Sequence, residues 1–331
     1  MLYPLIKPLL FSVNPELAHD ISLGLLQQFH PLFPDRRINK PVEALGLEFP
    51  NAVGLAAGLD KNGDYIDGLA KLGVGFIELG SVTPRAQAGN ATPRIFRLNQ
   101  HQSLINRMGF NNAGVDYLCA KIPARRSFIL GINIGKNRDT PLNQALDDYR
   151  ECFEKVYPFA DYITINISSP NTPGLRELQN ENELSALLEG IQSTRSRLED
   201  QHGYRRSLAL KLSPDLNTEA IPMIADLLRE HRVDGLIATN TTLDRQSVTN
   251  HRHAAETGGL SGAALRERSR SMLTGFYREL GDDIPIISVG GIDSIEEARW
   301  RLNAGARLIQ LYTGLIYHGP GLVRDIVRDA Y

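Results

Sequence analysis

The chain has 331 residues, 42% of them hydrophobic and 22% charged, which is the composition of an ordinary globular protein with enough apolar material for a large core. A net charge of −2 gives no electrostatic basis for binding nucleic acid, so we expect no such partner. The two cysteines, Cys119 and Cys152, lack CxxC spacing, which predicts no disulfide framework, no metal site and a reducing compartment.

Residues 1–40 are predicted to form a helical extension and a linker. Asn14-Pro15 is typical of an N-cap followed by proline at the first helical position, and the second helix should end near Phe29. The two helices carry apolar stripes: Leu2, Leu5, Ile6, Leu9 and Leu10, then Leu17, Ile21 and Leu25. Neither run approaches the roughly 18 apolar residues of a membrane span. The helices therefore either pack on the main domain or lie in a membrane surface.

After a hairpin-like segment that begins near Val42, apolar strand-like runs alternate with helical patterns. The predicted strands are 52–56, 75–80, 128–134, 161–167, 207–212, 234–239, 285–289 and 307–312. The predicted helices are 63–72, 112–121, 142–157, 181–200, 217–231, 263–280, 294–303 and 321–330. Eight such pairs predict an α/β fold, a closed (β/α)8 TIM barrel over residues 41–331. A doubly wound open sheet is the alternative, but no GxGxxG follows the first strand and no P-loop occurs.

The barrel prediction places chemistry at the carboxyl ends of the strands. These ends repeat Asn, Lys, Thr and Gly, which favours a site over ordinary turns. The most informative segment is ITINISSPNTPGL, residues 163–175, in which an apolar strand ends in amides and hydroxyls held by prolines. Taken alone, it is equally compatible with a polar turn.

Three further patterns indicate an anionic, ring-shaped ligand. The Gly-rich turns SVGGID and QLYTGL are suited to binding phosphate through backbone N–H groups, although both could be plain turns. Lys61 and Lys211 have no acidic residue at the same strand end except Asp60, so an anionic ligand is the simplest partner for them. Asn side chains can pair with a cyclic imide, and the backbone around Gly109 in NRMGF can bind a carboxylate.

The motifs together carry a family resemblance. In order they are GLAAGLDKNG, GSVTPRAQAGNATPRIFRL, INRMGFNN, GINIGKN, INISSPNTPGL, ALKLSPDL, IATNTT, GGLSG, SVGGID and QLYTGL. The chain resembles the dihydroorotate dehydrogenases of pyrimidine (UMP) biosynthesis over nearly its whole length. Serine rather than cysteine at Ser169, together with the leading helices, is similar to the class 2, quinone-dependent branch.

This resemblance implies an FMN-dependent oxidoreductase that oxidises (S)-dihydroorotate to orotate and passes electrons to a membrane quinone. The implied FMN contacts are Ala57, Gly58, Leu59, Asp60, Lys61, Ser81, Asn133, Asn166, Lys211, Thr239, Gly262, Gly291, Tyr312 and Thr313. The implied substrate contacts are Lys61, Asn106, Arg107, Met108, Gly109, Phe110, Asn166, Asn171, Asn240 and Thr241. Ser169 is the implied catalytic base, and Thr172 is our hypothesis for a proton relay to water.

The resemblance also implies a peripheral protein on the cytoplasmic face of the inner membrane, attached through its N-terminal helices. Since the barrel strands begin only near Ala52, we expect this extension to be separable from an FMN-containing barrel. Two alternatives remain. One is another FMN barrel, either class 1 or one that reduces a pyrimidine or uridine, and the other is a membrane-attached binding protein without catalysis.

Overall fold

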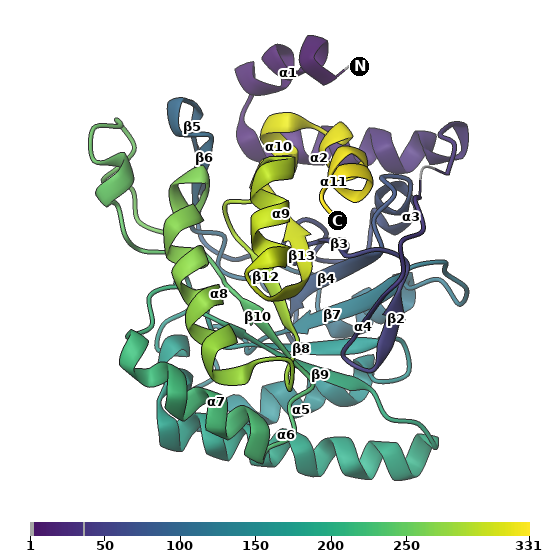
Figure 1. The fold of residues 1–331 in the computed structure, drawn as a ribbon, viewed down its shortest axis with the longest axis vertical. Coiled ribbons are helices and arrows are strands. Elements are labelled where there is room, and N and C mark those ends of the chain that lie inside the picture. Colours follow the sequence, from purple (N-terminus) through teal and green to yellow (C-terminus); the bar gives the residue numbers. More distant parts are fainter. Residues whose placement is uncertain (1–2, 36) are drawn as a thin grey trace.

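The computed structural model describes residues 3–35 and 37–331, so the predicted stripe residue Leu2 lies outside the described residues. Its central feature is a closed barrel of eight parallel strands (Figure 1). In order around the barrel these are β3 (Val53–Leu55), β4 (Phe76–Val82), β7 (Ile129–Ile134), β8 (Tyr162–Asn166), β9 (Ser207–Leu212), β10 (Gly235–Ala238), β12 (Ile286–Val289) and β13 (Ala306–Leu311). Because β13 pairs with β3, the sheet closes, which confirms the predicted barrel and excludes the open sheet.

Helices surround the barrel close to where the sequence predicts them. They are α3 (Ile66–Ala70), α4 (Val115–Lys121), α5 (Ala145–Val156), α6 (Glu181–His202), α7 (Ile221–Glu230), α8 (Arg266–Leu280), α9 (Ile295–Asn303), α10 (Thr313–His318) and α11 (Gly321–Asp329). Short 3-10 turns are η1 (His30–Leu32), η2 (Asn99–His101), η3 (Leu142–Gln144), η4 (Leu175–Gln179), η5 (Thr218–Ala220), η6 (Gln246–Val248) and η7 (Ala263–Leu265). Three predicted helices begin later than expected because η3, η5 and η7 occupy their first residues. The sequence analysis missed α10, which has only six residues.

An antiparallel hairpin closes the amino-terminal end of the barrel. It consists of β1 (Val42–Ala44) and β2 (Leu47–Phe49), and Phe49 is fully buried. The Phe49 ring meets that of Phe76 edge-on at 5.2 Å, with Tyr162 beside both rings. Since apolar side chains fill this end, only the carboxyl end of the barrel is available for a ligand.

A second small sheet lies beside the carboxyl end. Between β4 and β7 the chain forms an antiparallel hairpin of β5 (Ile95–Leu98) and β6 (Ser103–Asn106). A third strand, β11 (Gly259–Gly262), pairs antiparallel with β6. The Gly-rich sequence of β11 does not by itself predict a strand. The segment is a strand because it pairs with β6, which lies about 150 residues earlier in the chain.

The extension comprises α1 (Tyr3–Ser12) and α2 (Pro15–Phe29), as predicted, and Asn14 caps α2 by accepting from the amide of Glu16 at 2.9 Å. It packs on one side of the barrel near α10, where Lys7 Nζ donates to Tyr317 O at 2.8 Å (Figure 1). Arg97 of β5 donates to Val13 O at 2.7 Å and to carbonyls at the end of α1, while Gly68 N of α3 donates to Gln27 at 2.8 Å. The inner faces of the two helices therefore pack on the main domain.

The extension also exposes apolar side chains to solvent. Leu5 and Leu9 of α1 are 76% and 70% exposed. The other large apolar side chains exposed here are Ile6, Leu17, Ile21, Leu25, Phe29, Leu32 and Phe33. Within residues 3–35 and 37–331, no helix combines the length and the apolarity needed to cross a bilayer.

Candidate active site

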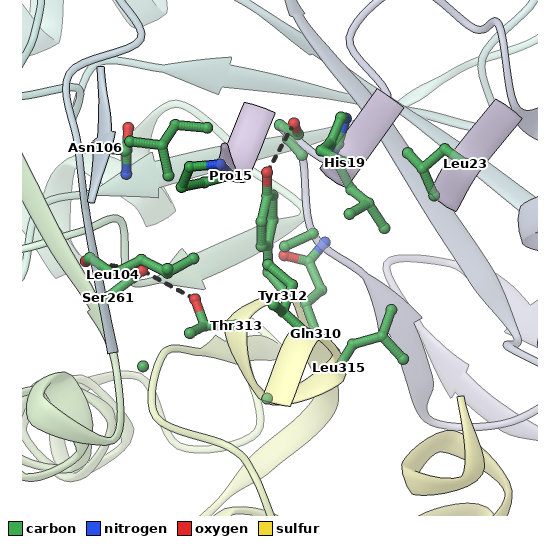
Figure 2. A pocket seen from close by; sticks show the side chains of 18 of the residues that line it. Pro15, His19, Leu23, Leu104, Asn106, Ser261, Gln310, Tyr312, Thr313 and Leu315 are labelled. Atoms are coloured by element: carbon green, nitrogen blue, oxygen red, sulfur yellow. Dashed lines mark hydrogen bonds between the residues drawn. The ribbon is translucent and has the colours of Figure 1, made fainter. Parts of the chain in front are cut away.

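One cavity of about 780 Å³ extends from the carboxyl ends of the barrel strands to the inner faces of α1 and α2. Twenty of the predicted site residues line it: Ala57, Gly58, Leu59, Lys61, Ser81, Asn106, Met108, Gly109, Phe110, Asn166, Ser169, Asn171, Lys211, Thr239, Asn240, Thr241, Gly262, Gly291, Tyr312 and Thr313. Figure 2 shows Tyr312 at the junction of its polar and apolar parts, close to Pro15 and His19 of α2, with its hydroxyl donating to Gly58 O at 3.1 Å. The structure thus brings strand ends far apart in sequence to a single space.

Three predicted site residues do not line the cavity, and each has a supporting position instead. The Asp60 carboxylate accepts the backbone N–H groups of residues 62–65 at 2.8–3.2 Å, which folds the loop that carries Lys61. Asn133 lies beneath the cavity and donates to Glu78 at 2.8 Å. Arg107 turns outward and pairs with Glu256 at 2.7 Å.

A network of amides and hydroxyls fixes the polar end of the cavity. Asn166 Nδ2 donates to Ser81 Oγ at 2.8 Å and to Asn133 Oδ1 at 3.1 Å. Ser168 Oγ donates to Asn166 Oδ1 at 2.8 Å and accepts from Asn240 Nδ2 at 3.0 Å. Because every one of these side chains has a partner, the site is held in one arrangement before a ligand arrives.

Ser169 follows this network on the loop after β8. It is buried, and its hydroxyl oxygen accepts from Asn171 N at 3.2 Å. Among the described residues no hydrogen bond joins Ser169 to Thr172, so the relay through Thr172 stays a hypothesis. Ser169 is therefore positioned in the cavity beside Asn171, as the sequence predicted.

Arg176, which sequence reasoning missed, holds the Ser169 loop. Its guanidinium donates to Ser168 O at 3.1 Å, Thr241 O at 3.0 Å and Asp215 Oδ2 at 2.9 Å. One planar side chain thereby joins the ends of β8, β9 and β10. The only sequence signal was a charged residue soon after a Pro-Gly turn.

The charge environment of Lys211 differs from the prediction. The sequence shows no acidic residue at the strand end of Lys211, which favours an anionic ligand as its partner, but Glu78 from within β4 lies 3.9 Å from Lys211 Nζ. Glu78 is fully enclosed and also accepts from Tyr162 at 3.0 Å and Gln310 at 2.7 Å. It was overlooked because it lies within an apolar strand and points into the barrel. Burial lowers the pKa of Lys211, and Glu78 opposes that shift.

Lys61 is half-buried and lines the cavity. Burial lowers the pKa of its ammonium to about 8, and the nearby Glu16 carboxylate opposes this change. Burial and the nearby charge of Lys61 lower the pKa of the His19 imidazole, in α2, to about 4. An anion bound beside Lys61 would stabilise the charged ammonium.

The half of the cavity nearest the extension is mainly apolar. Helices α1 and α2 contribute Ile6, Leu10, Phe11, Ala18, Leu23, Leu26 and Phe29. The polar side chains here include His19, Ser22 and Arg97. The Nε of Arg97 is buried with no hydrogen-bond partner among the described residues. Within residues 3–35 and 37–331, no cluster of three or more His, Cys, Asp or Glu side chains could hold a metal ion.

Comparisons with known proteins agree with this geometry. A family model described as Dihydroorotate dehydrogenase matches residues 41–330. Proteins named "Dihydroorotate dehydrogenase (quinone)" from Herminiimonas arsenicoxydans and Coxiella burnetii are each 53% identical; the alignments cover 98% and 99% of this chain and 96% of each relative.

Solved structures give the same result. The Eimeria tenella DHODH in complex with ferulenol superposes with a TM-score of 0.90 at 38% identity, covering 98% of this chain and 93% of that one. The ligand-free form has a TM-score of 0.87 at 40% identity, covering 95% and 93%. The chain therefore belongs to the dihydroorotate dehydrogenase family, within its quinone-dependent class 2 branch.

Proposed function

We propose that this protein oxidises (S)-dihydroorotate to orotate in pyrimidine biosynthesis, with FMN as redox cofactor and a membrane quinone as electron acceptor. The observation that carries this proposal is the single cavity with two chemically different halves. One half is a preformed polar site at the strand ends, and the other is an apolar space enclosed by the N-terminal helices. A small polar substrate and a lipid-soluble acceptor can thus approach one cofactor from different sides.

The residues at the barrel end fit FMN. Gly262 and Gly291 have positive φ angles of 91° and 76°, and a Cβ on Gly262 would come within 2.3 Å of Gln102 O, so these turns need glycine. Such turns leave backbone N–H groups free to approach a phosphate. Gln310 Oε1 is buried without a hydrogen-bond partner among the described residues and lines the cavity, which suits a ring N–H. The lysine Lys211 suits a ring that gains negative charge.

The roles of the other residues follow from their chemistry. When bound, FMN supplies the acceptor for the hydride that leaves C6 of dihydroorotate, and it passes the electrons on to quinone. Ser169 takes the proton from C5, so that the C5–C6 double bond of orotate forms. Asn166, Asn171 and Asn240 pair with the ring amides, and the residue 106–110 loop binds the carboxylate together with Lys61.

For the membrane, we propose a peripheral attachment on the cytoplasmic face of the inner membrane. The exposed apolar faces of α1 and α2 support this, because such faces are stabilised when they enter the interfacial region of a bilayer. We propose residues 1–40 as the attaching extension and residues 41–331 as the catalytic barrel. The alternatives of a class 1 enzyme, a uridine-reducing barrel or a binding protein offer no use for the apolar half of the cavity.

The direct test is a flavin spectrum. We expect the purified protein to be yellow, with FMN released on denaturation, and its absorption to bleach when dihydroorotate is added without an acceptor. Long-chain quinone should then restore the colour. A colourless protein that takes up no FMN would refute the cofactor. A yellow protein whose flavin reacts with pyrimidine or uridine substrates but not with dihydroorotate would favour the other FMN barrel.

A pH titration tests the role of Lys61. Since the pKa of Lys61 is lowered to about 8 and orotate is an anion, the affinity for orotate should fall above that pH, by about tenfold per pH unit. Lys61→Arg should lack this alkaline limb because a guanidinium stays charged. The measurement is the shift of flavin absorption on orotate binding. An identical profile in the variant and the parent protein would remove Lys61 from this role.

A further inference from the structure

The residue 106–110 loop at the polar end of the cavity rests on a second segment, residues 87–94. Asn90 N donates to Met108 O at 3.0 Å, and Asn90 Nδ2 donates to Arg107 O at 2.8 Å. Gln87 Nε2 donates to Gly109 O at 3.1 Å. A Cβ on Gly89 would lie 2.3 Å from Met108 O, so the two segments are in close contact. The position of the 106–110 loop therefore depends on residues 87–94.

Arg94 holds this supporting segment in its turn. Its Nη1 donates to Ala88 O at 2.7 Å and to Asn90 O at 2.9 Å, while its own carbonyl accepts from Arg107 N at 2.9 Å. The side chain is 12% exposed, so its charge needs a partner inside the protein. The barrel itself provides none: in the part of the chain that the structure describes, the only carboxylate paired with Arg94 is Glu16.

Glu16 belongs to the first turn of α2, in the N-terminal extension. Arg94 Nε donates to both oxygens of its carboxylate, at 3.0 and 3.1 Å. This pair lowers the pKa of Glu16, so the carboxylate stays charged at neutral pH. Glu16 belongs to the same turn of α2 as Pro15 and His19, and these two residues line the apolar half of the cavity (Figure 2).

We infer that the Glu16–Arg94 pair makes the N-terminal extension part of the dihydroorotate site. Through this pair, α2 positions residues 87–94 and thereby the loop that receives the substrate carboxylate. Arg94 and Glu16 are positioning residues, since neither touches the polar end of the cavity itself. The inference rests on the proposed function and changes one expectation: the extension is not fully separable, because its removal leaves Arg94 without its carboxylate partner.

The test is orotate binding to the FMN-loaded full-length protein. Glu16→Gln keeps the size of the side chain and removes its charge, and we expect it to raise the Kd for orotate by about tenfold, a usual scale for coupling between two sites. The KM for dihydroorotate should rise in parallel, while kcat and the KM for quinone change little. Arg94→Lys keeps the charge but cannot reach Glu16, Ala88 O and Asn90 O together, so it should weaken orotate binding similarly.

Asp20→Asn is the matched control, since Asp20 is an exposed carboxylate one turn further along α2 that makes no ion pair with Arg94. It should leave orotate affinity unchanged. The double variant Glu16→Gln with Arg94→Lys should be no weaker than either single variant, because both changes break the same connection. Flavin content and Tm show whether a variant is folded, and if Glu16→Gln is not, Arg94→Lys gives the answer.

The possible results are distinct. Unchanged orotate affinity in folded Glu16→Gln and Arg94→Lys overturns the inference, as does an equal loss in Asp20→Asn, which would indicate a general charge effect on Lys61. If the parent protein fails to bleach with dihydroorotate, the proposed function fails instead, and that is known before any variant is made.

Discussion

Ser169→Ala should slow the reduction of the bound flavin by dihydroorotate by about 10²- to 10⁴-fold, the usual contribution of a positioned acid or base. The change removes the proposed base from a loop whose backbone is fixed by Arg176, so the rest of the site should keep its shape. FMN content and orotate affinity should therefore stay close to those of the parent protein. Stopped-flow absorbance of the flavin gives the rate directly.

Two further variants make this measurement specific. Ser169→Cys should retain part of the activity, since a thiol can accept the same proton. Thr172→Val tests the relay, and an unchanged rate there would exclude it while leaving Ser169 in place. A Ser169→Ala protein that bleaches as fast as the parent would remove Ser169 from the mechanism.

Replacing five exposed apolar side chains on the extension by serine should abolish membrane binding. The five are Leu5, Leu9, Leu17, Ile21 and Leu25. A fully buried side chain of this kind contributes about 1.5–3 kcal/mol, so half that value for each gives roughly 4–8 kcal/mol in total. This corresponds to a loss of at least about 10³-fold in partitioning to vesicles. Sedimentation with phospholipid vesicles measures it.

The same variant separates the membrane from the active site. The Glu16–Arg94 pair is untouched, and of the five only Leu25 also lines the cavity, at its apolar end, so bleaching by dihydroorotate should be preserved while turnover with long-chain quinone in vesicles falls. Leu243→Ser is the control, because Leu243 lies outside the extension and is about as exposed as Leu17 and Leu25. If the fivefold variant sediments like the parent protein, α1 and α2 do not attach it to the bilayer.

Local patterns were sufficient for the elements of the fold. The alternation of β-branched runs with amphipathic helices identified all eight barrel strands, and Asn14-Pro15 located the start of α2. These signals are local because a strand buried on both faces must be apolar throughout, and a helix start needs a cap. Elements without such signals were missed: β11 exists through its pairing with β6, and α10 is a single short turn of helix.

The positions that line the cavity were also largely predictable, but the contacts that hold them were not. Twenty predicted positions line one cavity because, in a parallel barrel, every strand ends at the same rim. Which side chains hold them there depends on contacts between distant segments. Glu78 lies 133 positions before Lys211, and Arg94 lies 78 positions after Glu16. Neither pairing has a spacing rule that a sequence can display.

By itself, then, the sequence determined the closed barrel, the capped helical pair and the types of side chain at each strand end, because periodicity, capping and turn chemistry act between near neighbours in the chain. Only the tertiary structure decided that Asp60, Asn133 and Arg107 lie outside the cavity and that Lys211 has an internal carboxylate. It also decided that the extension reaches the residue 106–110 loop through Arg94. The physical reason is that burial and charge pairing depend on which distant segments the closure of the barrel brings together.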